Sequence, residues 1–205
     1  ETFNVSLSAL NSLVTDTDTA VGTITDGADS AAVTVENVSV AEGGNLVFTV
    51  TLNNAVQGGT EVAVTLSGGT ATGGALPLVY PEDYNNVVAN LTFTGNAGET
   101  RQFTVATLDD AVLEGTETFT VALNALHPLV TDTDTAVGTI TDGGDNASVT
   151  VADVTAAEGG GLLFTVTLNN AVQGGTTVQV TLTDVTATGG AAPLVTPEDY
   201  DRLSA

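Results

Sequence analysis

The sequence of this chain repeats itself at a fixed offset of 116 residues. The decapeptide TLNNAVQGGT occurs at 51–60 and again at 167–176, and LVTDTDTAVGTITDG occurs at 13–27 and at 129–143. The first 89 residues align on the last 89 without a gap, and 64 of these positions are identical. This period is too long for a solenoid unit, and it indicates whole domains in tandem.

The repeat is out of phase with the ends of the sequence, which opens inside an expected strand and closes just after the second PEDY. We therefore expect the C-terminal part of one repeat at 1–29, a complete repeat at 30–145 and the N-terminal part of the next at 146–205. Only about the four residues 143–146 separate the last expected strand of the complete repeat from the following one, which is too few for a flexible linker. Neighbouring repeats are expected to follow one another end to end.

Apolar and polar residues alternate within the complete repeat, and this period of two is typical of strands with one buried face. In the stretch 46–52, one face carries the apolar residues Leu46, Phe48, Val50 and Leu52. The expected strands lie at 33–40, 46–52, 61–67, 87–94, 101–108, 117–123 and 136–141. Clusters of Gly, Asn and Asp separate them, and no stretch has a helical period. About seven short strands per repeat predict an all-β fold of tandem immunoglobulin-like antiparallel β-sandwiches.

The charge of the chain is one-sided, with 25 acidic residues, two basic residues and a net charge of −23. Such a polyanion is not expected to bind nucleic acid or anionic lipid, because phosphate groups require Lys and Arg. No apolar run approaches the roughly 20 residues that span a membrane, so no membrane insertion is expected in this segment. Bound divalent cations would relieve the self-repulsion. An acidic surface that stays soluble in salty surroundings is the alternative interpretation.

Five motifs of the complete repeat occur in an order that resembles the Calx-beta family. They are AEGG (41–44), GTATGG (69–74), EDY (82–84), DDAVLEGTETFTVAL (109–123) and AVGTITD (136–142), of which the fourth is the most specific. The family is named for regulatory domains of sodium–calcium exchangers and is widespread in bacterial surface proteins. The resemblance implies Calx-beta repeats of a large bacterial extracellular or surface protein of the adhesin or fibre kind.

The resemblance also implies that acidic side chains from separate loops converge at one tip of the sandwich and bind Ca²⁺. In the complete repeat, the implied ligands are Glu42, Asp83, Asp109, Asp110, Glu114 and Asp142. Their counterparts in the partial repeats are Asp26, Glu158 and Asp199. Calcium takes six to eight oxygen ligands, and loop carboxylates supply them flexibly. Without a cation, such carboxylates would raise one another's pKa values.

Two features depart from the family pattern. The last strand is followed by Asp142-Gly143-Gly144-Asp145 rather than by two or three consecutive Asp, which removes implied ligands. An insertion at 75–82 lengthens the loop before Asp83, so the position of this carboxylate is left open. We therefore expect fewer ions or weaker binding.

Other acidic residues are expected to lie outside the site. Glu117 in ETF is expected to face solvent or a neighbouring repeat. Asp132 and Asp134 in TDTDT are interpreted as a solvated turn, although their spacing resembles that of ligands. The pair at 109–110 has a polar turn as its alternative interpretation.

No enzymatic function is expected. His127 is the only histidine, its counterpart is Asn11, and the chain has no Cys, Lys or Trp. We expect a structural calcium-binding repeat of a long extracellular or cell-surface protein, a stiff spacer or filament building block. Its partners would be neighbouring repeats and other copies in a fibre. The main alternative is an adhesive module that binds a carbohydrate or protein through exposed loops such as 75–84, and a calcium sensor is a third possibility.

Overall fold

The structure is a computed structural model that describes residues 1–25, 27 and 29–202. These residues form strands, turns and loops, and no helix among them is long and apolar enough to cross a membrane. The described chain divides into two compact units, each of which is described by itself below. The first contains Glu1–Asp110 and Gly115–Gly144, and the second contains Ala111–Glu114 and the chain from Asp145 onward.

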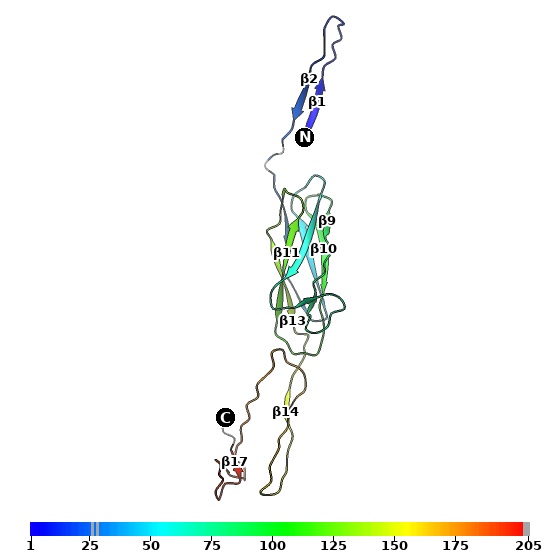
Figure 1. The fold of residues 1–205 in the computed structure, drawn as a ribbon. Helices are drawn as coiled ribbons and strands as arrows, with labels where there is room; N and C mark the ends of the chain where they lie inside the picture. Colours follow the sequence, from blue (N-terminus) through cyan, green and yellow to red (C-terminus); the bar gives the residue numbers. More distant parts are fainter. Residues whose placement is uncertain (26, 28, 203–205) are drawn as a thin grey trace. The chain divides into compact units, whose positions relative to one another are not determined.

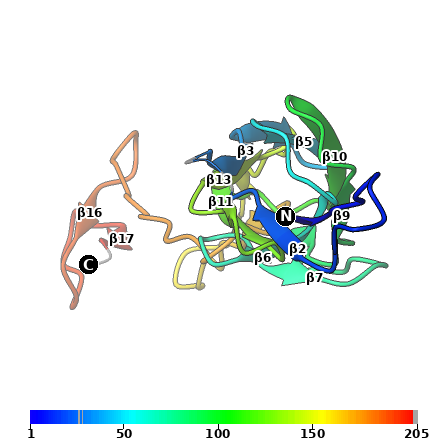
Figure 2. The same cartoon turned by 90° about the horizontal axis from the view of Figure 1, so that it is seen from above.

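Two sheets in the first unit form a β-sandwich. One sheet has the strand order β10-β5-β3-β12, and the other has the order β4-β13-β11-β6-β9. Figure 2 shows β3, β5 and β10 in one layer and β13, β11 and β6 in the other. The strands are β3 (Ala31–Val35), β4 (Val38–Ala41), β5 (Asn45–Leu52), β6 (Thr60–Ser67), β9 (Leu91–Phe93), β10 (Glu99–Ala106), β11 (Glu117–Ala125), β12 (Val130–Thr131) and β13 (Thr135–Thr141). The predicted all-β sandwich is confirmed.

The core lies between these two sheets and follows the alternation of the sequence. Leu46, Phe48, Val50 and Leu52 of β5 are fully buried, as predicted. The Phe48 ring stacks on Phe103 of β10, with centroids 5.0 Å apart, and meets the edge of Phe119 of β11 at 6.1 Å. Aromatic side chains from both sheets thus fill the centre of the sandwich. Figure 1 labels β10 of one sheet and β11 and β13 of the other.

The stretch 33–40, predicted as one strand, forms two strands in different sheets. β3 ends at Val35, and β4 begins at Val38 after the chain has crossed to the other sheet. At the crossing, the Asn37 side chain accepts a hydrogen bond from the backbone N–H of Val137, 2.7 Å away in β13. The prediction was wrong because apolar alternation continues through the crossing and hides it.

The strand predicted at 87–94 is also shorter than expected. Only β9 pairs with β6, and the residues before it form a loop. The Asn85 side chain accepts a hydrogen bond from the N–H of Val87 at 3.2 Å. Such a local bond offers the backbone an alternative to strand pairing.

Segments related by the 116-residue offset form the same strand pairs. The hairpin of β1 (Thr2–Ser6) and β2 (Thr19–Thr23) has the register of β11 and β13. The pair of β14 (Val149–Val151) and β15 (Val166–Leu168) has the register of β3 and β5. The short parallel pairs also correspond, namely β7 (Gly73–Gly74) with β8 (Tyr84–Asn85), and β16 (Gly189–Gly190) with β17 (Tyr200–Asp201). Equal sequence gives equal local structure, and the repeat boundaries at 30 and 145 stay a prediction.

Candidate metal centre

A parallel strand pair places the first two acidic residues of the candidate site. β4 and β13 run in the same direction, and their last residues, Ala41 and Thr141, are partners. Because parallel strands end at the same edge of a sheet, the residues that follow them, Glu42 and Asp142, emerge side by side. The N–H of Glu42 donates a hydrogen bond to the carbonyl of Thr141 at 2.9 Å, which fixes this arrangement.

Backbone hydrogen bonds join two further loops to this edge. The N–H of Gly43 donates to the carbonyl of Leu108 at 3.0 Å, and the N–H of Leu108 donates to the carbonyl of Asp83 at 2.9 Å. The AEGG, EDY and DDAVLE motifs, which are far apart in the sequence, therefore meet at one end of the sandwich. This convergence is what the resemblance implied for them.

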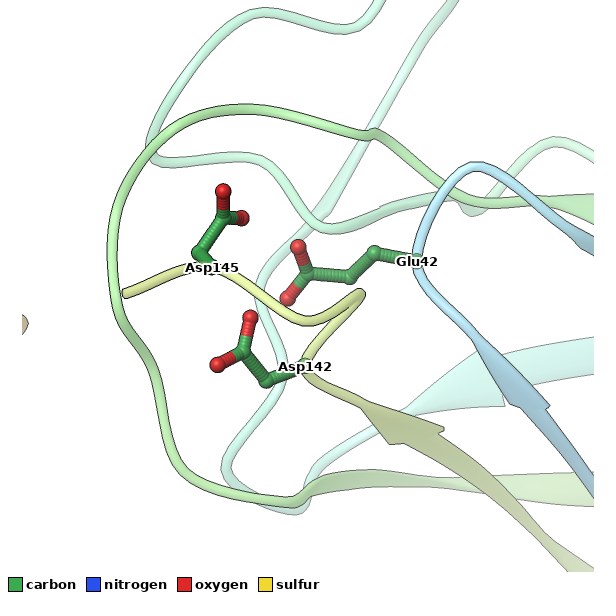
Figure 3. Close-up of side chains that lie close together, drawn as sticks. All are labelled: Glu42, Asp142 and Asp145. Atoms are coloured by element: carbon green, nitrogen blue, oxygen red, sulfur yellow. The ribbon is translucent and has the colours of Figure 1, made fainter.

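The carboxylates of Glu42 and Asp142 point toward one another, and each offers an oxygen within 4.8 Å of the other (Figure 3). Asp145, the third side chain drawn there, follows Asp142 three positions along the chain. The Oδ1 atom of Asp142 is buried and has no hydrogen-bond partner among the described residues. A buried carboxylate oxygen without a partner is costly, and a bound cation would satisfy it.

Asp109 lies against the glycine of the AEGG turn. Gly43 has a φ of +71°, and a Cβ placed on it would lie 2.8 Å from the Cβ of Asp109. On the other side, a Cβ on Gly143 would lie 3.4 Å from Oδ1 of Asp109 and 3.7 Å from the Cβ of Glu42. Asp109 therefore sits between the loops that carry Glu42 and Asp142. The two glycines leave room for its carboxylate.

A second pair of carboxylates consists of Asp83 and Glu117. They offer oxygens within 4.8 Å of each other, and their side chains share a hydrogen bond. The backbone of Asp83 is fixed by an N–H donated to the carbonyl of Thr72 at 2.7 Å, and its Oδ2 accepts the N–H of Thr72. Asp83 is thus held in place despite the insertion before it.

Glu117 is a correction to the sequence interpretation, which expected it to face solvent or a neighbour. It is only 6% exposed and begins β11, whose inward-facing residues include Phe119 and Val121. The signal was present in the sequence, because Glu117, Phe119 and Val121 are spaced two apart and therefore point to the same face of the strand. An acidic residue on the apolar face of a strand is expensive unless it has a partner or a cation.

The pKa of Asp83 is raised from 3.8 to about 6, and burial is the largest cause. The Thr72 N–H lowers this pKa, and the neighbouring Glu117 and Asp110 carboxylates raise it. The pKa of the adjacent Tyr84 is also raised, by burial first and by the Asp83 charge second. Tyr84 stacks on Phe119 with ring centroids 4.1 Å apart, so this acidic pair lies directly on the core. The raised pKa of Asp83 thus reflects burial first and the nearby negative charge of Glu117 and Asp110 second.

The remaining implied ligands differ in how the structure places them. Asp110 is half-buried and contributes to the electrostatics of Asp83. Glu114 is half-buried and belongs to the second unit, so its role as a ligand stays a prediction. Asp26 lies outside the described residues. Glu158 and Asp199 are exposed.

Asp199 nevertheless reproduces the local structure of its counterpart. Its Oδ2 accepts the N–H of Thr188 at 2.9 Å, and its own N–H donates to the Thr188 carbonyl at 2.7 Å. These are the contacts that Asp83 makes with Thr72. The partial repeat therefore forms this loop in the same way.

Asp132 and Asp134 lie at the far end of β13 from Asp142, because Asp134 precedes this strand and Asp142 follows it. Asp132 accepts the N–H of Ala125 at 2.8 Å, and Asp134 accepts the N–H of Val35 at 2.8 Å. The interpretation of TDTDT as a turn apart from the metal site agrees with this placement. The two carboxylates are, however, half-buried and serve as backbone acceptors.

The donor set of the site fits a hard cation. It contains carboxylate oxygens from four loops and no histidine or cysteine, and such oxygen-only sets suit Ca²⁺ or Mg²⁺ rather than Zn²⁺ or Cu²⁺. The buried Oδ1 of Asp142 and the crowding at Asp83 both favour a positive ion at this end of the sandwich.

Comparison with known families agrees with the motifs and the fold. The family model of the Calx-beta domain matches residues 25–153, which is more than half of the chain. The chain therefore belongs to the Calx-beta domain family. A comparison of the sequence with curated proteins finds no match.

Solved structures of this family resemble the chain at low sequence identity. The apo-form Calx CBD1 domain is 19% identical, the match covers 56% of this chain and 98% of that one, and the TM-score is 0.46. The calcium-binding domain CBD12 of CALX1.1 is 20% identical, with 54% of this chain and 44% of that one covered and a TM-score of 0.42.

Proposed function

We propose that this chain is a structural calcium-binding segment of a long extracellular or cell-surface protein, in which it acts as a stiff spacer or filament building block. The observation that carries the proposal is the convergence of acidic loops on one end of the sandwich, where the buried Oδ1 of Asp142 has no hydrogen-bond partner among the described residues. Calcium would supply charge compensation and cross-link these loops. The residues that would hold it are Glu42, Asp109 and Asp142 at one position and Asp83, Asp110 and Glu117 at the other.

The repeat itself supports a spacer. Sequence identity at 64 of 89 positions is what a spacer tolerates, because its function depends on length and stiffness rather than on individually adapted binding sites. The net charge of −23 opposes compaction, so the chain would be looser where calcium is scarce and ordered where it is abundant. Such behaviour suits a protein that is exported and then ordered outside the cell.

Thermal unfolding in excess calcium and in excess chelator, at matched ionic strength, tests the calcium site. Calcium at 100 times its dissociation constant stabilises the folded chain by about 2.7 kcal/mol if it binds only that state. The variant Asp142→Asn should lose most of this gain. The matched control Asp134→Asn removes the same charge at the other end of β13 and retains an oxygen for the Val35 N–H, so its calcium response should be unchanged.

Coinciding melts in calcium and chelator would show that the acidic loops bind no calcium. Equal calcium responses of the Asp142 and Asp134 variants would show that the effect is general charge screening rather than a site.

A second function, adhesion through the loop 75–84, is favoured by one specific observation. Leu76, Val79 and Tyr80 are each more than half exposed at the tip of this loop. Its turn is braced by Glu82, whose carboxylate accepts the N–H of Val79 at 3.1 Å. In the next repeat the positions of Leu76 and Tyr80 are occupied by Ala and Thr, so this apolar tip is a feature of one repeat.

Binding of the chain to immobilised carbohydrates and surface proteins would test adhesion, with the double variant L76S/Y80S as the probe of the loop tip. An adhesive module loses binding in this variant, whereas a spacer binds none of these partners in either form.

A further inference from the structure

In the second unit, a short segment of the DDAVLE motif is hydrogen-bonded to the AVQGG loop at 171–175. The N–H of Leu113 donates to the carbonyl of Ala171 at 2.9 Å, and the N–H of Gln173 donates to the carbonyl of Leu113 at 3.0 Å. These two bonds form a parallel β-bridge between Leu113 and Val172. Leu113 therefore uses both its backbone donor and its backbone acceptor on one loop.

The two partners come from different copies of the repeat. Residues 111–114 lie within the DDAVLE motif of the complete repeat, and residues 171–175 lie 26 or more positions into the next one. The chain thus passes from Asp110 in the first unit into the second unit, and it returns to the first unit at Gly115.

An independent contact in the first unit involves the same loop sequence. AVQGG also occurs at 55–59, and the side-chain amide of Gln57 donates a hydrogen bond to the carboxylate of Glu1 at 2.9 Å. Glu1 is the counterpart of Glu117 and belongs to the repeat that precedes the complete one. In both units, therefore, an AVQGG loop is bonded by a residue of the preceding repeat.

The two loops also have the same backbone conformation at their paired glycines, where the φ angles are positive. The paired glycines have φ angles of +83° and +76° at Gly58 and Gly59, and of +75° at both Gly174 and Gly175. Residues other than glycine rarely adopt such angles. The sequence thus preserves one loop shape at both places, and it exposes Gln57 in the first of them.

We propose that the AVQGG loop is the docking surface through which each repeat binds the repeat before it. Its partner is the AVLE segment of that repeat, which adds a backbone bridge as Leu113 does to Val172. The complete repeat carries both the loop, at 55–59, and the partner segment, at 111–114. Such a heterologous contact does not close on itself and generates open head-to-tail arrays.

This inference goes beyond the calcium site and does not depend on it, because the two bonds of the bridge join backbone groups alone. The direct test is backbone amide hydrogen exchange in the 205-residue chain, measured by NMR in excess chelator. Gln57 and Gln173 have identical neighbours, so their intrinsic exchange rates are matched. The N–H of Gln173 donates to Leu113, whereas that of Gln57 has no acceptor among the described residues.

The Gln173 amide is expected to exchange about tenfold more slowly than the Gln57 amide, the factor that a hydrogen bond of ordinary net strength provides. Equal rates in chelator would overturn the docking inference and leave the calcium proposal untouched. Conversely, coinciding thermal melts in calcium and chelator would overturn the calcium site and leave the docking contact standing.

A variant pair tests whether the bridge between Leu113 and Val172 protects the Gln173 amide. Leu113→Pro removes the N–H that Ala171 accepts and should raise the Gln173 exchange rate to that of Gln57, while Leu113→Ala keeps both backbone groups and should retain the protection. Amides of β11, which lie in the sandwich core, report whether either variant unfolds. Persistent protection of Gln173 in Leu113→Pro, with the core amides unchanged, would contradict the inference.

Discussion

The substitution Glu117→Gln should have opposite effects on the stability of the chain in chelator and in calcium. Glu117 is buried, and its carboxylate shares a hydrogen bond with Asp83. Glutamine has the same shape and donates a hydrogen bond to Asp83 without adding negative charge. In chelator the variant is therefore more stable, because the crowding of carboxylates is relieved, and in calcium it loses a candidate ligand.

The magnitude follows from the pKa of Asp83. A rise from 3.8 to about 6 corresponds to at most about 3 kcal/mol. Burial is the largest cause of that rise, and the half-buried site is screened by water, so removal of the Glu117 charge should stabilise the chelated chain by about 1 kcal/mol. For a domain of this size, that is a rise of about 4 °C in Tm at pH 7.

The sign of the pH dependence follows from the same shift. The folded state holds the Asp83 proton more tightly than the unfolded state, so in chelator the free energy of unfolding falls as pH rises from about 4 to about 6. Glu117→Gln should make this fall smaller. Calcium should also suppress it, because the ion takes the place of the proton.

Thermal unfolding followed by circular dichroism at pH 5 and pH 7, in chelator and in calcium, measures all of these effects. Glu36→Gln is the matched control, because Glu36 is exposed and its loss changes the net charge by the same amount. A lower Tm for Glu117→Gln than for the unaltered chain in chelator at pH 7 would refute the argument from charge crowding. An undiminished calcium response would remove Glu117 from the site.

Three further substitutions test other parts of the structure. Gly43→Ala should destabilise the chain by about 1–2 kcal/mol and weaken calcium binding measured by calorimetry. The reason is that the φ of +71° is strained for alanine and the new Cβ would lie 2.8 Å from the Cβ of Asp109. An unchanged Tm would show that the turn adapts. Phe48→Ala should cost about 3–5 kcal/mol in urea unfolding, since this fully buried ring contacts aromatic residues of both sheets, and a loss below 1 kcal/mol would contradict the described core. The backbone N–H of Thr94 and further donors of the same turn lower the pKa of Glu99 to about 2, so the contribution of Glu99 to stability is complete above about pH 4.5 and is lost as pH falls toward 2. Glu99→Gln should therefore reduce the loss of Tm between pH 4.5 and pH 2, and an unaltered loss would assign it to other carboxylates.

The alternation of apolar residues predicted most of the strands, because burial of one sheet face leaves a period of two in the sequence. It gave the inward face of β5 correctly, where Leu46 and Phe48 are buried while Val47 is 44% exposed. It failed at 33–40, where the chain changes sheet without breaking the period. Alternation shows which residues of a strand face the core, but it contains no information about which sheet the strand belongs to.

The candidate site shows the same division between local and long-range information. The parity of Glu117 with Phe119 was sufficient to predict a buried carboxylate, since both occupy the same face of one strand. The proximity of Glu42 and Asp142 had no such local signal, because it depends on the parallel pairing of β4 with β13 across about 100 residues of chain. Only the order of the family motifs pointed to it. The alternation within β11 was thus enough to place Glu117 on the buried face, but the sheet topology decides which carboxylates face one another, and hence where a cation would be held.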